Sequence, residues 1–320
     1  MKKVLVTGGC GFIGSNFVRM LLEETELEVV NLDLLTYAGN PENLKDVQDN
    51  ERYTFVKGDI KSRADVEKAM EGVDTVFHFA AESHVDNSIN DSDPFIMTNV
   101  LGTKNMMDVA MAKGVEKFIH VSTDEVYGSV EEGSSTEKDL LEPRNPYSAS
   151  KAASDLLVLS YVNTFDFNAC ITRSSNNYGP YQFPEKLIPL FVTNLMENKK
   201  VPVYGTGENI RDWLYVKDNC KGILIAGQKG KKGNIYNVDG GNELSNIELT
   251  KRILNMMGKG EEMIEHVEDR KGHDLRYSLD SSKLESFGWK PEKNFDEGLK
   301  ETVEWYKNNE SWWKPLKVKK

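Results

Sequence analysis

The sequence predicts an α/β protein, with a Rossmann-like doubly wound parallel sheet and a smaller C-terminal substrate-binding region. Apolar segments of strand length alternate with longer helical segments through residue 122. The first of these strands runs into a glycine-rich loop that opens a helix. After residue 173 the alternation weakens, and Gly, Pro and Asn become frequent. We therefore divide the chain into residues 1–173, the sheet domain, and residues 174–320, which we expect to be partly interleaved with it.

Six strands are expected in the sheet, each a short apolar run between turn signals. They cover residues 4–7, 29–32, 53–57, 75–79, 118–121 and 169–172. The spacing of apolar residues indicates helices between these strands. They cover residues 15–22, 62–70, 95–113 and 147–165.

The C-terminal region has a less regular pattern. Helices are expected to end at residues 196 and 257, with further helices at 216–226 and 295–307 and a short strand at 235–238. Ser245 and Glu248 have the spacing of a capping box at the start of the helix that ends at 257. We interpret residues 201–213 as turn-rich, and the basic residues 314–320 as a solvated terminus.

Composition and charge exclude several classes of protein. The apolar runs are too short to span a bilayer, and the chain enters its first strand at once, so we expect neither a membrane segment nor a secretory signal. A net charge of -11 argues against a nucleic-acid-binding surface. Three widely spaced cysteines predict no disulfide framework and no metal site. These features together predict a cytoplasmic protein.

The glycine loop predicts a dinucleotide site. Gly8, Gly11 and Gly14 lie between a strand and a helix, where backbone N–H groups can approach a pyrophosphate. Asp33 follows the second strand, about twenty residues after the loop, where a carboxylate would accept both ribose hydroxyls of adenosine. Because an acid there repels a 2′-phosphate, the expected cofactor is NAD. Asp59 ends the third strand and could contact adenine or cap the next helix.

Proton-transfer groups converge at the end of the fifth strand. Thr123, Asp124 and Glu125 follow that strand, at the sheet edge where ligands bind in open α/β folds. Tyr147 and Lys151 are four residues apart at the start of a helix, so they share one face. Two neighbouring carboxyl groups resist double ionisation, which raises the pKa of one of them. The alternative is a solvated turn after a strand.

The motifs together resemble a known family. In chain order they are T-G-G-C-G-F-I-G, H-F-A-A-E-S-H-V-D, V-S-T-D-E-V-Y-G, Y-S-A-S-K, N-N-Y-G-P, F-P-E-K-L-I-P, Y-G-T-G-E-N-I-R-D-W and D-R-K-G-H-D. This set resembles the dTDP-glucose 4,6-dehydratases of the extended short-chain dehydrogenase/reductase superfamily, over almost the whole chain. Two residues depart from the pattern: Asn87 stands where Arg is frequent, and Leu34 where Lys is common.

The resemblance implies a set of ligand-binding residues. NAD would be bound by Gly8, Gly11, Phe12, Ile13, Gly14, Asp33, Leu34, Leu35, Thr36, Asp59, Ile60, Phe79, Ala80, Ala81, Glu82, Ser83, Thr98, Tyr147, Lys151 and Asn177. The nucleotide sugar would be bound by Ser83, His84, Thr123, Asn176, Lys186, Leu187, Pro202, Val203, Tyr204, Arg211, Asn246, Asp269, Arg270, Lys271, Gly272 and His273. For His84, Tyr204 and Arg270 the alternatives are a satisfied polar group, a turn aromatic and a surface charge.

The implied reaction converts dTDP-glucose to dTDP-4-keto-6-deoxyglucose and water. Oxidation at C4 comes first, because the C5 proton becomes acidic only beside a carbonyl. In this scheme Tyr147 takes the O4 proton, Lys151 lowers the phenol pKa, and Thr123 hydrogen-bonds O4. Glu125 then removes the C5 proton, Asp124 protonates the leaving C6 hydroxyl, and NADH returns its hydride to C6.

Three other functions remain in competition. A 4,6-dehydratase acting on UDP-glucose or another nucleotide hexose would use the same residues, since base choice depends on a few contacts. A UDP-hexose 4-epimerase needs Tyr147 but has no use for the acid–base pair Asp124 and Glu125. A catalytically inactive NAD-binding protein would be expected to lose Tyr147, Lys151 or an acid. The resemblance also implies a homodimer, paired through helices 95–113 and 147–165.

Overall fold

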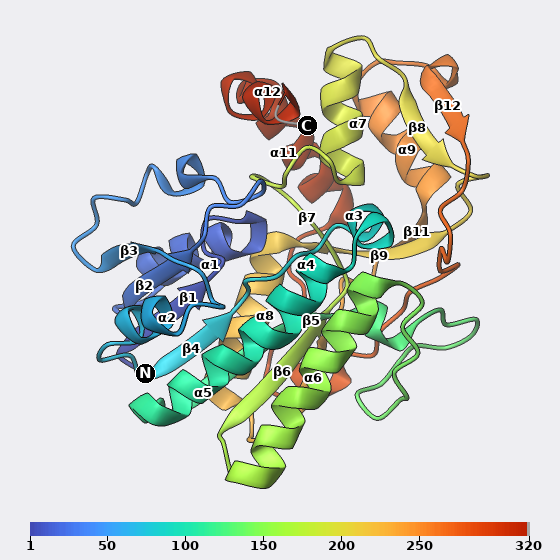
Figure 1. Ribbon diagram of the computed structural model, residues 1–320. Coiled ribbons are helices and arrows are strands. Elements are labelled where there is room, and N and C mark those ends of the chain that lie inside the picture. Colours follow the sequence, from blue (N-terminus) through green and yellow to red (C-terminus); the bar gives the residue numbers. More distant parts are fainter. Residues whose placement is uncertain (319–320) are drawn as a thin grey trace.

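The fold is built on one seven-stranded parallel sheet with helices on both faces (Figure 1). The computed structural model describes residues 1–318. The order of strands across the sheet is β10-β6-β5-β4-β1-β2-β3, and every pairing between neighbours is parallel. The strands are β1 (Lys3–Thr7), β2 (Glu28–Asp33), β3 (Tyr53–Lys57), β4 (Thr75–His78), β5 (Lys117–Thr123), β6 (Ala169–Ser174) and β10 (Ile235–Val238). This arrangement confirms the predicted Rossmann-like sheet.

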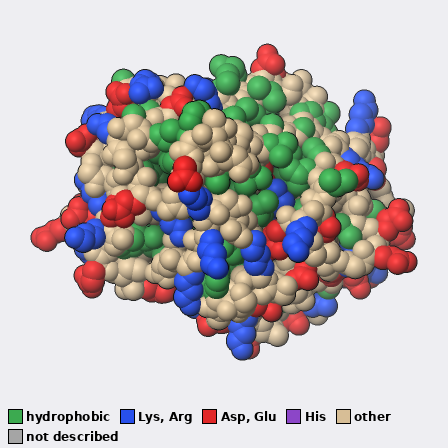
Figure 2. Space-filling model, turned by 90° about the horizontal axis from the view of Figure 1, so that it is seen from below, with side chains coloured by type: hydrophobic (Ala, Val, Ile, Leu, Met, Phe, Trp, Pro, Cys, Tyr) green, Lys and Arg blue, Asp and Glu red, His purple; other side chains and the backbone are tan. Residues whose placement is uncertain are grey.

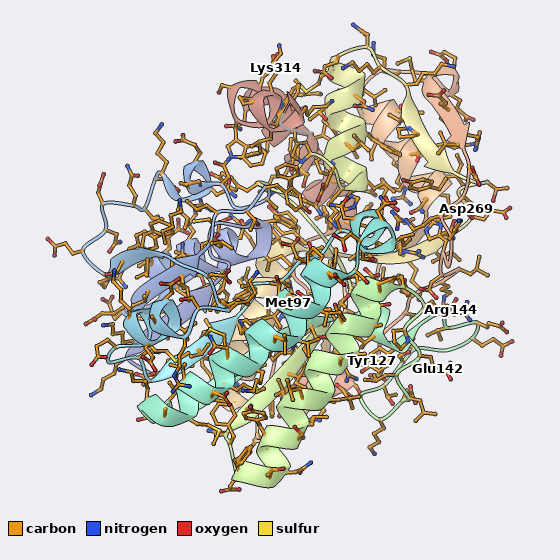
Figure 3. All side chains as sticks on the ribbon, in the orientation of Figure 1. Met97, Tyr127, Glu142, Arg144, Asp269 and Lys314 are labelled. Carbon is orange, nitrogen blue, oxygen red and sulfur yellow. The ribbon has the colours of Figure 1, made fainter. Side chains whose placement is uncertain are left out.

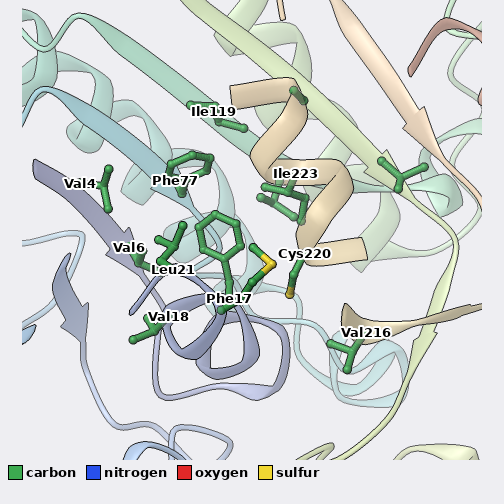
Figure 4. Packing of buried hydrophobic residues seen from close by; sticks show 14 of the residues in the cluster. Val4, Val6, Phe17, Val18, Leu21, Phe77, Ile119, Val216, Cys220 and Ile223 are labelled. Carbon is green, nitrogen blue, oxygen red and sulfur yellow. The ribbon is translucent and has the colours of Figure 1, made fainter. Parts of the chain in front are cut away.

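The two faces of the sheet are covered by different helices. One apolar cluster joins the sheet to α1 (Phe12–Glu24) and α8 (Val216–Lys229), and Figure 4 shows part of it. In it the rings of Phe17 and Phe77 are 4.7 Å apart between centroids. A second cluster joins the other face to α2 (Arg63–Ala69), α5 (Thr103–Lys113) and α6 (Pro146–Phe165). Figure 1 shows α5 and α6 side by side across the front of the sheet.

Helix ends follow the capping rules. Ser62 caps α2 by accepting from the Asp65 N–H, so Asp59 is not the cap of that helix. Asn145 caps α6 in a capping box with Ser148. The predicted helix at 95–113 is a continuous helical rod with a π-helical middle. Its parts are α4 (Asp93–Phe95), η2 (Ile96–Gly102) and α5. The other short elements in this part of the chain are α3 (Val85–Asn90), η3 (Asp124–Tyr127) and η1 (Pro41–Leu44), which packs against α1.

Most of the later elements lie beyond the carboxyl ends of the strands (Figure 1). Two small sheets stand there, ordered β11-β9-β7 and β12-β8. The strands are β7 (Asn176–Tyr178), β8 (Val201–Tyr204), β9 (Ile210–Tyr215), β11 (Glu243–Ser245) and β12 (Ile264–Val267). The helices are α7 (Leu187–Met196), α9 (Asn246–Met256), η4 (Glu261–Met263), α11 (Phe295–Asn308) and α12 (Glu310–Val318). The short helix α10 (Ser282–Glu285) packs against β10 and α8 instead. By contrast, β10 and α8 return to the first sheet.

Two expectations for this region are corrected by the structure. Residues 201–213 are not merely turn-rich, because they form β8 and most of β9, whose Val201, Val203 and Trp213 are buried. The basic end is not a solvated terminus as far as residue 318, since α12 buries Leu316 and the Lys317 ammonium pairs with the Glu197 carboxylate. In both segments, Gly, Pro or Lys residues obscured the alternating or helical spacing of the apolar residues. Residues 319–320 of that expectation lie outside the described residues.

Candidate active site

Two adjoining cavities lie at the carboxyl edge of the sheet. The larger, of about 410 Å³, extends from the glycine loop after β1 to the end of β5 and the start of α6. The smaller, of about 210 Å³, lies beside it under α7, β8 and the loop before residue 275. They share the lining residues Glu125, Asn176, Asn177, Gln182, Glu185 and Lys186. β1 lies between β2 and β4, where strand order reverses, and an open α/β sheet forms its ligand crevice at such a point.

The glycine loop has the close backbone approach that a dinucleotide needs. Gly8 has a φ of +70°, and a Cβ on it would come within 2.9 Å of the Ala80 backbone. A Cβ on Gly14 would lie 2.2 Å from the Gly8 carbonyl oxygen, so a side chain is excluded at both positions. The loop leads directly into the N-terminus of α1, where backbone N–H groups can hold an anion. These features fit the pyrophosphate of a dinucleotide.

Asp33 fixes the loop as well as facing the cavity. Its carboxylate accepts hydrogen bonds from the backbone N–H groups of Cys10 and Leu35, at 2.9 and 2.8 Å. Burial raises the pKa of Asp33, and these two hydrogen bonds oppose the rise. The predicted cofactor residues other than Leu35 all line the larger cavity. Leu35 instead turns the chain with a left-handed φ of 60°.

The three polar residues after β5 form one hydrogen-bonded unit. The Thr123 hydroxyl donates to Asp124 Oδ1 at 3.1 Å and accepts from the Glu125 backbone N–H at 3.3 Å. The Asp124 side chain is buried, with only 3% of its surface exposed, so it is not part of a solvated turn. Burial and the Glu125 charge raise the pKa of Asp124 well above its usual range.

Glu125 lies in a different electrostatic setting from its neighbour. Burial raises its pKa, but positive charges on Lys186, Arg211 and Arg270 oppose that rise. Its Oε2 atom also lies 3.5 Å from Nδ2 of Asn145, which donates to it. The pKa values of the two carboxyl groups are therefore driven apart, so that Asp124 is the group held protonated and Glu125 is the group whose ionised form the cations stabilise.

Tyr147 and Lys151 both line the larger cavity from the first turns of α6. The Lys151 ammonium donates to the Val121 backbone carbonyl at 2.8 Å. Burial lowers the pKa of Lys151 to about 8, and the Asp155 carboxylate one turn further along opposes this. The pKa of Tyr147 is raised by burial and by Glu125, although a hydrogen bond with Thr123 lowers it. The expected lowering of the Tyr147 pKa by Lys151 is not seen in the ligand-free protein, where the net shift is upward.

The smaller cavity gathers most of the residues predicted for the nucleotide sugar. It is lined by His84, Asn176, Lys186, Leu187, Pro202, Val203, Tyr204, Arg211, Asn246, Arg270, Gly272 and His273. Ser83 and Thr123 line the larger cavity instead, whereas the exposed residues Asp269 and Lys271 line neither. Asp269 accepts a hydrogen bond from His273, and Figure 3 labels it on the loop after β12.

Both arginines are held by the protein itself. Arg270 binds the Asp86 carboxylate with two hydrogen bonds, of 2.5 and 2.9 Å, and stacks over the Tyr204 ring. Arg211 stacks over Tyr277 and donates to backbone carbonyl groups, including that of Asp274 at 2.9 Å. Arg270 is thus not a loose surface charge, and both guanidinium groups are pre-oriented at the smaller cavity.

Several lining residues were missed by sequence reasoning. Asn145 was not predicted, although the N-P-Y-S pattern, with an N-cap residue before a proline, indicates the start of a helix. Asp86 lies inside a motif but meets Arg270, a partner 184 residues away, only in the fold. Glu185 likewise stands in F-P-E-K-L-I-P and reaches Tyr37 across the cavity mouth. Only tertiary contacts reveal the last two.

Comparison with known proteins places this site in a family. A family model described as GDP-mannose 4,6 dehydratase matches residues 5–302. A dTDP-glucose 4,6-dehydratase of Streptomyces antibioticus is 50% identical over 321 residues, covering 98% of this chain and 95% of the relative. The chain belongs to the dTDP-glucose 4,6-dehydratase family.

Two further matches cover nearly the full chain. The low-salt glycan biosynthesis protein Agl12 of Haloferax volcanii is 50% identical over 303 residues, covering 95% of this chain and 98% of the relative. The crystal structure of DesIV, the dTDP-glucose 4,6-dehydratase of Streptomyces venezuelae, superposes with a TM-score of 0.97 at 50% identity. It covers 98% of this chain and 99% of DesIV, and it was solved with NAD and dTDP bound.

Two features are absent from residues 1–318. No helix there has both the length and the apolar character needed to cross a membrane. The same residues contain no group of three or more His, Cys, Asp and Glu side chains that could hold a metal ion.

Asp124→Asn is expected to make stability less dependent on pH. The folded pKa of Asp124 lies well above its usual value of 3.8, so the native state holds a proton that the unfolded state releases. Stability therefore falls as pH rises from 3.8 towards the folded pKa, and the variant lacks this loss. Urea unfolding between about pH 5 and pH 8 measures the difference. Asp49→Asn, at an exposed site, is the control. Equal slopes for wild type and Asp124→Asn would contradict the burial argument.

Proposed function

We propose that the protein is a dTDP-glucose 4,6-dehydratase, which converts dTDP-glucose to dTDP-4-keto-6-deoxyglucose and water. The observation that carries this is the pair Asp124 and Glu125, held beside Tyr147 and Lys151 in one cavity but driven apart in acidity. An elimination needs an acid and a base at once, whereas epimerisation at C4 needs neither carboxyl group. Relatives with this name at 50% identity support the same reaction.

NAD is proposed as the resident cofactor of the larger cavity. The glycine loop, the N-terminus of α1 and Asp33 would bind its pyrophosphate and adenosine, and Lys151 the nicotinamide ribose. Bound NAD would supply the hydride acceptor for C4, the hydride donor for C6 and a positively charged ring. DesIV, solved with NAD bound, supports this assignment.

The first chemical step uses the groups on α6 and β5. Tyr147 takes the O4 proton, helped by the positive charge of Lys151 and by the hydrogen bond with Thr123. Burial and Glu125 raise the phenol pKa in the ligand-free protein. Tyr147 therefore depends on Lys151 and Thr123 to act as a base. Keeping Asp124 protonated removes a second negative charge from the same cavity. Thr123 is placed to hold O4 as the ketone forms.

The elimination then uses the two carboxyl groups. Glu125 removes the C5 proton, and Asp124 donates its proton to the leaving C6 hydroxyl. Lys186, Arg211 and Arg270 hold the Glu125 pKa down in the ligand-free protein, and the same cations are assigned to the nucleoside diphosphate. Binding of the diphosphate would neutralise part of their effect. Glu125 would then become a stronger base only when substrate is present.

Residues 1–173 are proposed to carry the cofactor and residues 174–320 most of the nucleotide contacts. Tyr204, Arg211 and Arg270 supply a ring and two cations, which suit a pyrimidine and a diphosphate. Leu187, Leu190 and Phe191 add an apolar wall to the smaller cavity, which favours the methylated base of dTDP over that of UDP.

A cytoplasmic setting is proposed for the protein. Cys10, Cys170 and Cys220 are all buried and free. Burial raises the pKa of each thiol, to about 12 for Cys10 and about 11 for Cys170, so none is a reactive thiolate at neutral pH. Buried free cysteines are typical of proteins in a reducing compartment.

Purified protein, supplied separately with dTDP-glucose and UDP-glucose, tests the function. We expect dTDP-glucose to lose one water and give a 4-keto-6-deoxy sugar without net NADH, as followed by mass spectrometry. Loss of water only from UDP-glucose would keep the mechanism and correct the base. Formation of UDP-galactose from UDP-glucose, with no loss of water even after NAD is added, would overturn the proposal in favour of an epimerase.

Substitutions at three of the proton-transfer positions are expected to affect different steps of the reaction. Tyr147→Phe should lower turnover about 10²- to 10⁴-fold without forming NADH, because oxidation fails. Glu125→Gln should let oxidation proceed and then stall, so that NADH absorbance accumulates. Asp124→Asn should slow the loss of water. Glu142→Gln, an exposed carboxylate on the loop before α6 (Figure 3), is the control. Wild-type product formation by Glu125→Gln would contradict its role.

The helical face formed by η2, α5 and α6 is proposed to pair in a homodimer. Its exposed apolar side chains are Ile96, Met97, Leu101, Met111, Leu156 and Phe165. Figure 3 labels Met97 on this face, and Figure 2 shows hydrophobic side chains gathered in the upper part of the view from below. So many large apolar side chains on two neighbouring helices are typical of a protein–protein interface.

Leu156→Arg is expected to convert the dimer to a monomer. This side chain is 58% exposed on α6, and a buried arginine without a partner there would oppose pairing. Sedimentation velocity at micromolar concentration measures the mass. Leu140→Arg, at a side chain that is 80% exposed on the loop before α6, is the matched control and should remain dimeric. A monomeric wild type, or a Leu156→Arg variant that still pairs through this face, would contradict the proposal.

A further inference from the structure

One contact crosses the mouth of the larger cavity and has no part in the chemistry above. Tyr37 belongs to the segment after β2, and Glu185 to the segment before α7. The Tyr37 hydroxyl donates to Glu185 Oε1 at 2.9 Å, joining residues 148 positions apart. The Tyr37 ring also meets the Phe183 ring edge-on, with centroids 5.4 Å apart. The two segments therefore touch through a polar and an apolar contact.

The two segments line different parts of the cavity wall, which we call its two rims. Thr36, Ala38 and Gly39 form the first rim, near the Asp33 carboxylate, where adenosine is assigned. Phe183, Glu185 and Lys186 form the second rim. The contact between Tyr37 and Glu185 thus ties the two rims together.

The Tyr37 segment is held in place by the glycine loop. The Leu35 N–H donates to Asp33 Oδ1 at 2.8 Å, and the Asn40 N–H donates to the Cys10 carbonyl at 2.9 Å. Leu35 adopts a left-handed φ of 60°, which costs energy for a non-glycine residue and persists only where the surroundings impose it. This fixed turn carries Tyr37 to the second rim, where its side chain is 39% exposed.

The Glu185 carboxylate is also well placed to accept the hydrogen bond from the Tyr37 hydroxyl. Its side chain is only 5% exposed, and its Oε2 lies 3.7 Å from Nε2 of His84. Burial and the Glu185 charge raise the pKa of Tyr37, so its hydroxyl remains a proton donor throughout the neutral range. A hydrogen bond from a neutral phenol to a carboxylate is charge-assisted, and such bonds are stronger than those between two neutral groups.

We propose that Tyr37 and Glu185 form a latch that retains NAD in the larger cavity between turnovers. This inference rests on the proposed function, in which NAD is regenerated on the same sugar and does not need to be exchanged between turnovers. Departure of the cofactor requires the rims to separate, which breaks the hydrogen bond and the Phe183 contact. The latch slows release without touching the reacting atoms.

The test is the rate of cofactor release from the full-length holoprotein. Protein loaded with isotopically labelled NAD is chased with excess unlabelled NAD, and the label that remains bound is followed over time. We expect Tyr37→Phe to release NAD about tenfold faster, because only the hydroxyl is lost. Tyr215→Phe removes a similar phenol-to-carboxylate bond, to Glu301 Oε1 at 2.6 Å, away from both cavities. It is the matched control and should release NAD at the wild-type rate.

A second variant removes the same bond from the other side. Glu185→Ala should also release NAD faster, and the double variant should be no faster than the quicker single variant, since one bond is lost once. Unchanged release from Tyr37→Phe and Glu185→Ala would overturn the latch while leaving NAD as the cofactor. A wild-type protein that neither retains nor takes up NAD would overturn the proposed cofactor itself.

Discussion

The hydrogen bond from Lys151 to the Val121 carbonyl ties α6 to the end of β5, and the geometry of the candidate site depends on it. It brings an ammonium one turn from Tyr147 to the strand that carries Thr123, Asp124 and Glu125. Asn145 adds a second tie, because it caps α6 and also donates to Glu125. The start of α6 therefore holds a phenol and an ammonium beside the two carboxyl groups at the end of β5, as a preorganised site requires.

Neighbouring charges give the two buried carboxyl groups their separate roles. Burial raises the pKa of both Asp124 and Glu125, and Arg211 opposes the rise at both. Lys186 and Arg270 oppose it further at Glu125, whereas the Glu125 charge adds to the rise at Asp124. The same cations face the smaller cavity, so substrate binding and acid–base chemistry share one electrostatic field. Arg270 has Asp86 as its partner in the ligand-free protein, which keeps the cation oriented while the diphosphate is absent.

On the cofactor side of the site, backbone segments approach one another closely. On the substrate side, side chains from distant parts of the chain contact one another. Gly8 and Gly14 leave no room for a side chain, and Asp33 holds the loop through two backbone N–H groups. Across the cavity mouth, Glu185 joins Tyr37 on the cofactor side and approaches His84 on the other. The cofactor side is therefore built from contacts around the glycine loop, and the substrate side from residues distant in sequence.

The sequence by itself determined the parallel sheet, the glycine loop, and the placing of residues 123–125, 147 and 151 at its edge, because strand periodicity and helix spacing are local properties. Only the tertiary structure decided that β8 and β9 form in 201–213, that α12 buries Leu316, and that Asp86 and Glu185 meet Arg270 and Tyr37. It also decided that the Tyr147 pKa is raised in the ligand-free protein. All of these features depend on burial and on contacts between residues far apart in sequence, and a short segment of the chain specifies neither.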